Sequence, residues 1–167
     1  MVHIYTGDGK GKTTAAFGLA LRAAGAGLKV CIFQFIKGPD QCESAILSKA
    51  KNIKFEQCGR GLFIKGKAAG KDIDYAKKGL CDIQKRIKTG KYDMIILDEV
   101  NVALHKGLIS TAEIIAMIND KPDSVELVLT GRYCPKSLYK YADLVTEMRN
   151  IKHPFDKGIK ARLGIEY

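Results

Sequence analysis

The sequence lacks the features that direct a protein into or across a membrane. No apolar run approaches the roughly 20 residues that a membrane-spanning helix needs. After Met1 the chain continues with Val2-His3-Ile4-Tyr5, which is not a charged, apolar and small-residue leader. Internal repeats and low-complexity tracts are missing too. We therefore expect a cytoplasmic protein with no membrane partner.

Cysteine pairs of the kind that form disulfide frameworks or zinc sites are also missing. The five cysteines contain no Cys-x-x-Cys pair and have no histidine at zinc-ligand spacing. They are Cys31, Cys42, Cys58, Cys81 and Cys134. We expect buried small apolar residues and surface thiols that take no part in catalysis.

The composition is that of an ordinary folded domain. Of 167 residues, 46% are hydrophobic and 28% are charged, so one domain spanning 1–167 is expected. The formal net charge of +10 suits a polyanionic partner such as a nucleotide or a nucleic acid. The lysines are scattered, however, and no recognised nucleic-acid motif accompanies them. We expect no nucleic-acid partner.

Strand-like apolar runs alternate with helical patterns along the chain. This alternation is typical of β-α-β units and predicts an α/β fold, with a mostly parallel sheet and helices on both faces. The predicted strands are Val2 to Thr6, Lys29 to Phe35, Ile53 to Gln57, Met94 to Leu97, Glu126 to Leu129 and Leu144 to Met148. The predicted helices are Thr13 to Ala26, Glu43 to Lys51, Ile73 to Lys88, Ser110 to Asn119 and Pro135 to Tyr141. A capping box of Ser110 with Glu113, and a stop at Gly25 and Gly27, support two helix ends.

The strongest motif lies between the first strand and the first helix. It comprises Gly7, Asp8, Gly9, Lys10, Gly11, Lys12, Thr13 and Thr14. In such a P-loop the glycines turn backbone N–H groups toward phosphate oxygens, Lys12 supplies a positive charge, and Thr13 offers its hydroxyl to Mg²⁺ or Mn²⁺. The fold class is therefore P-loop NTPase-like, with a triphosphate as the expected ligand. The usual pattern begins with glycine where this chain has Thr6, so the loop is effectively one residue tighter.

Two further strands end in polar residues that would complete a nucleotide site. One delivers Asp98 and Glu99, of which one carboxylate can hold the metal and the other can orient a reacting group. Another leads into Thr130 and Arg132, which we expect to reach phosphate or ribose. The plain alternatives are exposed acids after a strand, and a surface arginine.

Seven blocks of sequence fit together as one larger pattern. They are Gly7 to Gly18, Gln34 to Gly38, Leu97 to Glu99, Thr130 to Arg132, Ala142 to Met148, Lys152 to Ala161 and Gly164 to Tyr167. In this order they resemble the P-loop type of ATP:corrinoid (cob(I)alamin) adenosyltransferase, and the resemblance extends from the first strand to the last residue. The combination is far more specific than a P-loop alone.

The resemblance implies transfer of the 5′-deoxyadenosyl group of ATP to the Co(I) of cobalamin or a related corrinoid, with release of triphosphate, in cobalamin biosynthesis or salvage. It also implies an ATP reversed relative to ordinary P-loop proteins, which agrees with the tightened loop. The catalytic residues implied are Lys12, Thr13 and Glu99, with Thr13, Glu99 and Asp98 at the metal. The ATP-binding residues implied are Gly7, Asp8, Gly9, Lys10, Gly11, Lys12, Thr13, Thr14, Phe35, Lys37 and Arg132.

Further expectations come from the same family. It implies a homodimer and a reduced flavoprotein that brings cobalt to Co(I). Some members fold an N-terminal extension over the site, whereas this chain starts at its first strand, so we expect closure from elsewhere or from a partner subunit. Members often carry aromatic residues after Gly-Arg-Gly that displace the lower axial ligand of cobalt, where this chain has Leu62, Phe63 and Ile64. His153 would lie near nucleotide or corrinoid, or else make a structural hydrogen bond.

The residues alone leave two other functions open. The first is a P-loop ATPase or kinase in which Glu99 positions water or a hydroxyl for phosphoryl transfer. The second is a regulatory ATP module that binds nucleic acid through its positive charge.

Overall fold

The computed structural model describes residues 1–36, 42–58 and 69–166, and these ranges contain one six-stranded sheet. The strand order is β3-β2-β4-β5-β1-β6, and every pair of neighbouring strands is parallel. The strands are β1 (Val2–Thr6), β2 (Val30–Gln34), β3 (Ile53–Gln57), β4 (Met94–Asp98), β5 (Glu126–Thr130) and β6 (Leu144–Glu147). The predicted α/β class is confirmed, and each predicted strand ends within one residue of the observed one.

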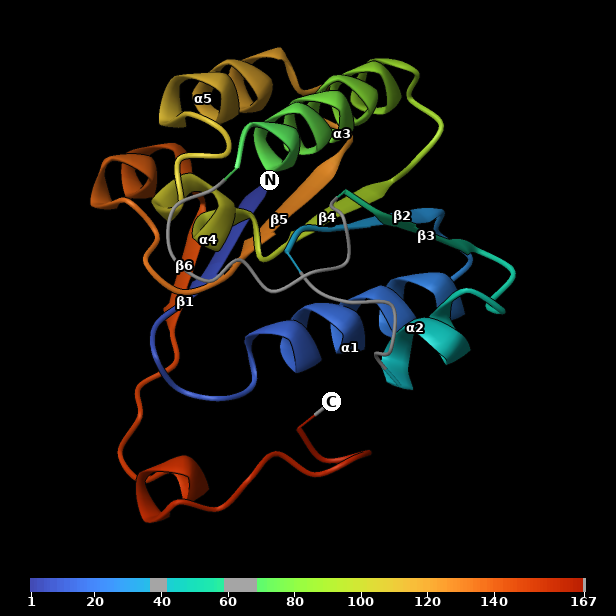
Figure 1. Ribbon diagram of the computed structural model, residues 1–167. Coiled ribbons are helices and arrows are strands. Elements are labelled where there is room, and N and C mark those ends of the chain that lie inside the picture. Colours follow the sequence, from blue (N-terminus) through green and yellow to red (C-terminus); the bar gives the residue numbers. More distant parts are fainter. Residues whose placement is uncertain (37–41, 59–68, 167) are drawn as a thin grey trace.

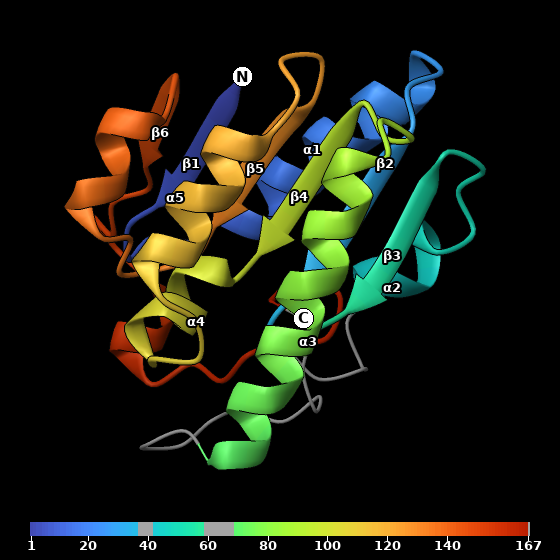
Figure 2. The ribbon, with the colours of Figure 1, turned by 90° about the horizontal axis from the view of Figure 1, so that it is seen from above.

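Helices cover both faces of the sheet (Figure 1). On one face lie α1 (Lys12–Gly25) and α2 (Cys42–Leu47), and on the other lie α3 (Gly70–Lys88), α4 (Val100–His105) and α5 (Thr111–Asp120). Figure 2 shows these last three helices from above, in front of the sheet, with α3 and α5 running along the direction of the strands. Two short 3₁₀ helices, η1 (Lys136–Tyr141) and η2 (Pro154–Lys157), flank β6. Within the described ranges, no helix is long and apolar enough to cross a membrane.

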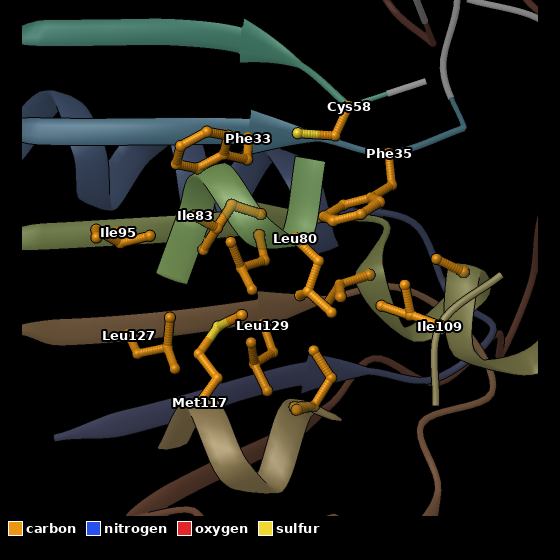
Figure 3. Packing of buried hydrophobic residues seen from close by; sticks show 14 of the residues in the cluster. Phe33, Phe35, Cys58, Leu80, Ile83, Ile95, Ile109, Met117, Leu127 and Leu129 are labelled. Atoms are coloured by element: carbon orange, nitrogen blue, oxygen red, sulfur yellow. The ribbon is translucent and has the colours of Figure 1, made fainter. Parts of the chain in front are cut away.

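The two-sided core follows from the pattern of the central strands. Successive strand residues point to opposite faces, so in β4 Met94 and Ile96 pack on the α1 side while Ile95 and Leu97 pack on the α3 side. All four are buried, because helices cover both faces. Figure 3 shows the packing on the α3 side, where Leu80 and other α3 side chains meet the sheet. Strands that are buried on both faces consist of continuous apolar residues, and for this reason β4 could be predicted from the sequence.

The two predicted helix ends are confirmed in atomic detail. After α1, Gly27 has a φ of 88°, and the N–H of Leu28 donates to the carbonyl of Ala23 over 3.0 Å. This is the Schellman arrangement, which needs a residue that tolerates positive φ. At the start of α5, the Glu113 N–H donates to the Ser110 hydroxyl over 3.3 Å, while the Ser110 N–H donates to the Glu113 carboxylate over 2.7 Å.

Other local predictions were incomplete. The structure adds α4 and η2, neither of which was expected, and it makes the segment predicted as a helix from Pro135 a 3₁₀ helix that begins at Lys136. The added elements span six and four residues. Over so few residues a helical period cannot be told from chance.

The strand order brings three loops to one edge of the sheet. β5 lies between β1 and β4, with Tyr5 opposite Thr130 and Leu97 opposite Leu129. Because the strands are parallel, the loops after β1, β4 and β5 leave from the same edge, where ligands bind in open α/β sheets. Described non-glycine residues with positive φ also lie just beyond strands at this edge: Ile36 (60°), Glu99 (60°) and Tyr133 (64°). Because strained backbone clusters at functional sites, this edge is the candidate site.

Candidate active site

The loop between β1 and α1 is packed tightly against the segment that follows β6. The N–H of Gly9 donates to the carbonyl of Met148 over 2.6 Å, and a Cβ at Gly9 would lie 2.7 Å from the carbonyl oxygen of Arg149. At Gly7 the φ is 96°, and a Cβ would overlap the Met148 carbonyl. Both positions therefore require glycine for packing. The expectation that the Gly9 N–H faces phosphate is wrong in this structure, since that N–H is bonded to the protein.

The start of α1 is open to an anion. Its N-cap is Gly11, with a φ of 113°, which has no side chain to accept a hydrogen bond, and the first turn holds no acidic residue. The positive end of the helix dipole therefore lacks a negative side chain on its own helix. Lys12 lies at this point, 8% exposed, and its ammonium donates to the Gly9 carbonyl over 2.6 Å. The bond holds the lysine at the helix end.

Asp98 is the centre of a buried polar network behind this helix end. Its side chain is 0% exposed, and one carboxylate oxygen accepts from the hydroxyls of Thr13 over 2.9 Å and Thr130 over 2.6 Å. The other oxygen accepts from the Gln34 amide over 2.9 Å. Hydrogen bonds to a buried carboxylate offset its loss of hydration. Asp98 thus fixes the Thr13 hydroxyl from behind.

Thr130 joins this network to the neighbouring acid. Its hydroxyl donates to Asp98 and accepts from the backbone N–H of Glu99 over 3.0 Å. Thr130 is 0% exposed, so the prediction that it reaches phosphate or ribose is wrong. The β4–β5 pairing turns it inward to hold Glu99 at its φ of 60°.

Gly131 leaves room for the Glu99 carboxylate. A Cβ at Gly131 would lie 3.2 Å from Glu99 Oε2 and 3.1 Å from the Asn101 Cβ, and the φ of Gly131 is 126°. The Asn101 amide donates to the Gly131 carbonyl over 3.2 Å, so the turn is fixed from the α4 side as well. Glycine at this point is favoured by the backbone conformation, and a side chain would also press on Glu99 and Asn101.

These elements surround a cleft of about 260 Å³ at the carboxyl edge of the sheet. Its lining comprises Gly9, Lys10, Gly11, Lys12, Thr13, Thr14, Glu43, Glu99, Arg132, His153, Ile165 and Glu166. Three of these side chains are cationic and three are carboxylates. A triphosphate binding here would therefore meet both charges, and a cation or a rearrangement would have to offset the carboxylates.

The structure gathers most of the predicted site residues in this cleft. Those that line it are Gly9, Lys10, Gly11, Lys12, Thr13, Thr14, Glu99 and Arg132, with Asp98 directly behind Thr13. Gly7 and Asp8 are not among the lining residues. Phe35 is a correction: its side chain is 0% exposed and lies in the core on the α3 side (Figure 3). Lys37 and the run from Gly59 to Ile64 fall outside the described residues.

His153 takes the structural role that was weighed against a functional one, while still lining the cleft. Its Nδ1 accepts from the Phe155 N–H over 3.1 Å, which caps η2. Three other lining residues had no assigned role: Glu43, Ile165 and Glu166. Glu166 lies in a block that resembles the family, but no pattern in the sequence places it beside the P-loop.

Glu166 is held in the cleft by two cations. Its carboxylate accepts from Lys10 Nζ over 3.1 Å and from Arg162 Nε over 3.1 Å, Nη2 over 3.0 Å and backbone N–H over 2.8 Å. The Arg162 side chain, the Arg162 N–H and Lys10 in turn lower the pKa of Glu166 to about 2. The side chain is therefore ionised at neutral pH.

The donor set of the cleft fits a magnesium ion. Mg²⁺ prefers oxygen ligands and is commonly held by one or two protein groups together with substrate phosphates. The Thr13 hydroxyl and the Glu99 carboxylate line the same cleft, and the Thr13 hydroxyl donates its proton to Asp98. These are the residues that would hold the ion.

The parallel sheet, the glycine loop opening α1 and the paired acids after β4 define a P-loop nucleotide-binding protein. The family model described as ATP:corrinoid adenosyltransferase BtuR/CobO/CobP matches residues 1–167. The chain therefore belongs to the ATP:corrinoid adenosyltransferase family. ATP and a corrinoid are accordingly its substrates, and it is a transferase of cobalamin metabolism.

Individual relatives agree with the family model. The corrinoid adenosyltransferase of Escherichia coli (strain K12) is 33% identical over 167 residues, covering 100% of this chain and 85% of the relative. The corrinoid adenosyltransferase of a Sinorhizobium species is 36% identical over 171 residues, covering 100% and 80%. Corrinoid adenosyltransferase CobA of Salmonella typhimurium (strain LT2) is 33% identical over 167 residues, covering 100% and 85%.

Proposed function

We propose that residues 1–167 act as one catalytic domain that transfers the 5′-deoxyadenosyl group of MgATP to the Co(I) of a corrinoid and releases inorganic triphosphate. The observation that carries this proposal is the cleft at the start of α1, where Lys12, Thr13 and Glu99 meet. Lys12 and α1 supply positive charge for a triphosphate, and the two oxygen ligands supply a site for its metal. The family match over the whole chain supplies the reaction.

The leaving group is the part of the reaction that the protein can stabilise. Negative charge gathers on the triphosphate as the bond to ribose breaks, and Lys12 with the positive end of α1 lies where that charge would develop. Arg132, exposed at the cleft, adds a further cation. Thr13 and Glu99 would hold Mg²⁺ or Mn²⁺, which neutralises phosphate charge when bound. Asp98 orients Thr13 from behind.

The transfer needs no proton shuttle. The electron pair of Co(I) forms the new bond to the ribose C5′, the C5′–O bond breaks, and its electron pair leaves with triphosphate. Cobalt ends as alkyl-Co(III), and no proton is gained or lost. This accounts for a site built from charge and alignment, in which no residue needs to act as a general base.

The test is anaerobic incubation of the protein with MgATP and chemically reduced cobalamin. Loss of the Co(I) spectrum, with adenosylcobalamin and triphosphate formed in equal amounts, is the expected result. Lys12→Ala should lower kcat/KM by about 10² to 10³, because the lysine acts on the leaving group. Lys136→Ala removes an exposed lysine outside the cleft and serves as the matched control.

The same assay separates the rival reaction. If Co(I) persists while ATP is split to ADP and phosphate, the enzyme performs phosphoryl transfer and the proposed chemistry is wrong. If Lys12→Ala keeps full activity with the fold intact, the assignment of the phosphate cleft fails even though adenosyl transfer stands.

The reaction also needs a cellular location, an oligomeric state and a source of electrons for cobalt. We infer a cytoplasmic homodimer that receives electrons from a reduced flavoprotein. Exposed apolar side chains on β6 and the segment after it support a covering second copy: Leu144, Val145, Ile151, Phe155 and Ile159. Sedimentation of a monomer at micromolar concentration would contradict the dimer. An association rate with flavoprotein that does not respond to salt would contradict charge-guided docking.

A further inference from the structure

The segment after β6 contacts the P-loop near both of its ends, through Met148 at the start and Ile165 at the far end. In Figure 1 it runs in red from β6 to a position below α1. At the far end of this segment, the Ile165 carbonyl and the Glu166 carboxylate accept hydrogen bonds from Lys10 Nζ of the P-loop over 2.7 Å and 3.1 Å. A glutamate thus reaches the lining of the phosphate cleft from a distant part of the chain.

The groups around the Glu166 carboxylate are those that bind phosphate. It accepts hydrogen bonds from one ammonium, one guanidinium and one backbone N–H. Arginine and lysine donors of this kind bind phosphate and carboxylate oxygens alike. The Glu166 carboxylate therefore occupies an anion-binding position, and an incoming triphosphate would compete for the same donors.

We propose that Lys10 and Arg162 form an anion subsite for the triphosphate of ATP, and that Glu166 occupies this subsite as an internal competitor until triphosphate displaces it. The inference rests on the proposed function, because it takes the cleft to be the triphosphate site. Displacement transfers Lys10 and Arg162 from the carboxylate to phosphate oxygens. No covalent step is involved.

The two cations that hold Glu166 are open to an incoming anion. The side chains of Lys10 and Arg162 are 46% and 57% exposed, whereas that of Glu166 is 18% exposed, so an anion can reach both cations from solvent. Neighbouring apolar side chains, Leu163 and Ile165, are 70% and 56% exposed, so little burial holds this segment in place. Segments with few buried contacts open at low free-energy cost.

The first test measures binding of inorganic triphosphate with Mg²⁺ by titration calorimetry, without corrinoid or catalysis. Glu166→Gln removes the competing charge and should tighten binding on the order of fivefold, the scale of an exposed ion pair. Asp156→Asn makes the same charge change on the same segment, outside the cleft lining, and should leave the affinity unchanged. Equal affinities for wild type and Glu166→Gln, or weaker binding by the variant, would overturn the proposal.

A second pair of variants tests the subsite itself. In the Glu166→Gln background, Arg162→Gln should weaken triphosphate binding several-fold, because the guanidinium then has only phosphate to bind. With Lys10→Gln present, the gain from Glu166→Gln should shrink, since the competitor has lost one of its two cations. If the changes in triphosphate affinity caused by the single variants simply add in the double variants, a shared subsite is refuted.

Amide hydrogen exchange follows the displacement directly. The N–H groups of Arg162 and Glu166 bond to Glu166 Oε2 over 2.8 Å and to the Arg162 carbonyl over 2.9 Å. Saturating triphosphate should speed exchange of this segment in the wild type, and slower exchange would contradict displacement. If triphosphate does not bind the wild type at all, the proposed function fails; if it binds without these changes, only the competitor fails.

Discussion

Replacing Thr130 with valine tests the buried network behind the site. Valine matches threonine in shape but lacks the hydroxyl that donates to Asp98 over 2.6 Å and accepts from the Glu99 N–H over 3.0 Å. The side chain is 0% exposed, so water cannot replace either bond. Losing partners of a buried carboxylate and of a backbone N–H should cost about 2 to 3 kcal/mol of unfolding free energy.

The same change should disturb the proposed metal site. Without the hydroxyl, the Glu99 backbone loses a bond that holds its positive φ, and groups that orient metal ligands typically affect affinity or activity by about 10- to 100-fold. The concentration of Mg²⁺ needed for half-maximal rate should therefore rise. Urea unfolding gives the stability, and initial rates against Mg²⁺ concentration give the second effect.

Thr130→Ser is the control that separates hydrogen bonding from packing. Serine keeps the hydroxyl and loses one methyl group, so it should cost only about 1 kcal/mol and leave the Mg²⁺ dependence unchanged. If valine is as stable as threonine to within about 0.5 kcal/mol, or if serine is as damaging as valine, the network does not act as described.

Two further predictions concern glycines and thiols. Gly9→Ala should cost about 1 to 3 kcal/mol of stability, because its Cβ would lie 2.7 Å from a backbone carbonyl oxygen. Gly18→Ala has nothing within 4 Å of its Cβ and should gain about 0.5 to 1 kcal/mol in the helix. Equal effects of the two changes in urea unfolding would refute the packing argument. Burial raises the pKa of the Cys31, Cys58 and Cys134 thiols to about 12. A thiol reagent near neutral pH should therefore modify only the exposed Cys42 and Cys81 quickly in the native protein. Fast modification of all five cysteines would contradict the burial.

The sheet and the larger helices were predictable because their signals are local. Central strands such as β4 are unbroken apolar runs, and the capping box at Ser110 lies within four residues of sequence. The P-loop was visible for the same reason, since a strand, a glycine-rich turn and a helix follow one another directly. In each case the residues that interact are neighbours in the chain.

Contacts between distant residues could not be read in this way. Phe35 and Thr130 each lie at the end of an apolar run. Whether such a side chain lies in the core or lines the site depends on which strands and helices are next to it. The β4–β5 pairing turns Thr130 toward Asp98, 32 residues earlier in the chain. The pairing of Lys10 with Glu166 spans 156 residues and involves common surface residue types, so no periodicity or spacing could reveal it.

The tightened P-loop and the returning segment have one structural explanation. Thr6, which stands where the usual pattern has its first glycine, is the last residue of β1 and is paired with Glu147 of β6. The loop then packs on the next residues of that segment, so the Gly9 N–H bonds to Met148 and is lost to phosphate. The remaining anion-binding groups begin at Lys10, nearer the helix. The Gly9 N–H is therefore not available to a triphosphate in this cleft, whose lining on the helix side begins with Lys10, Gly11 and Lys12.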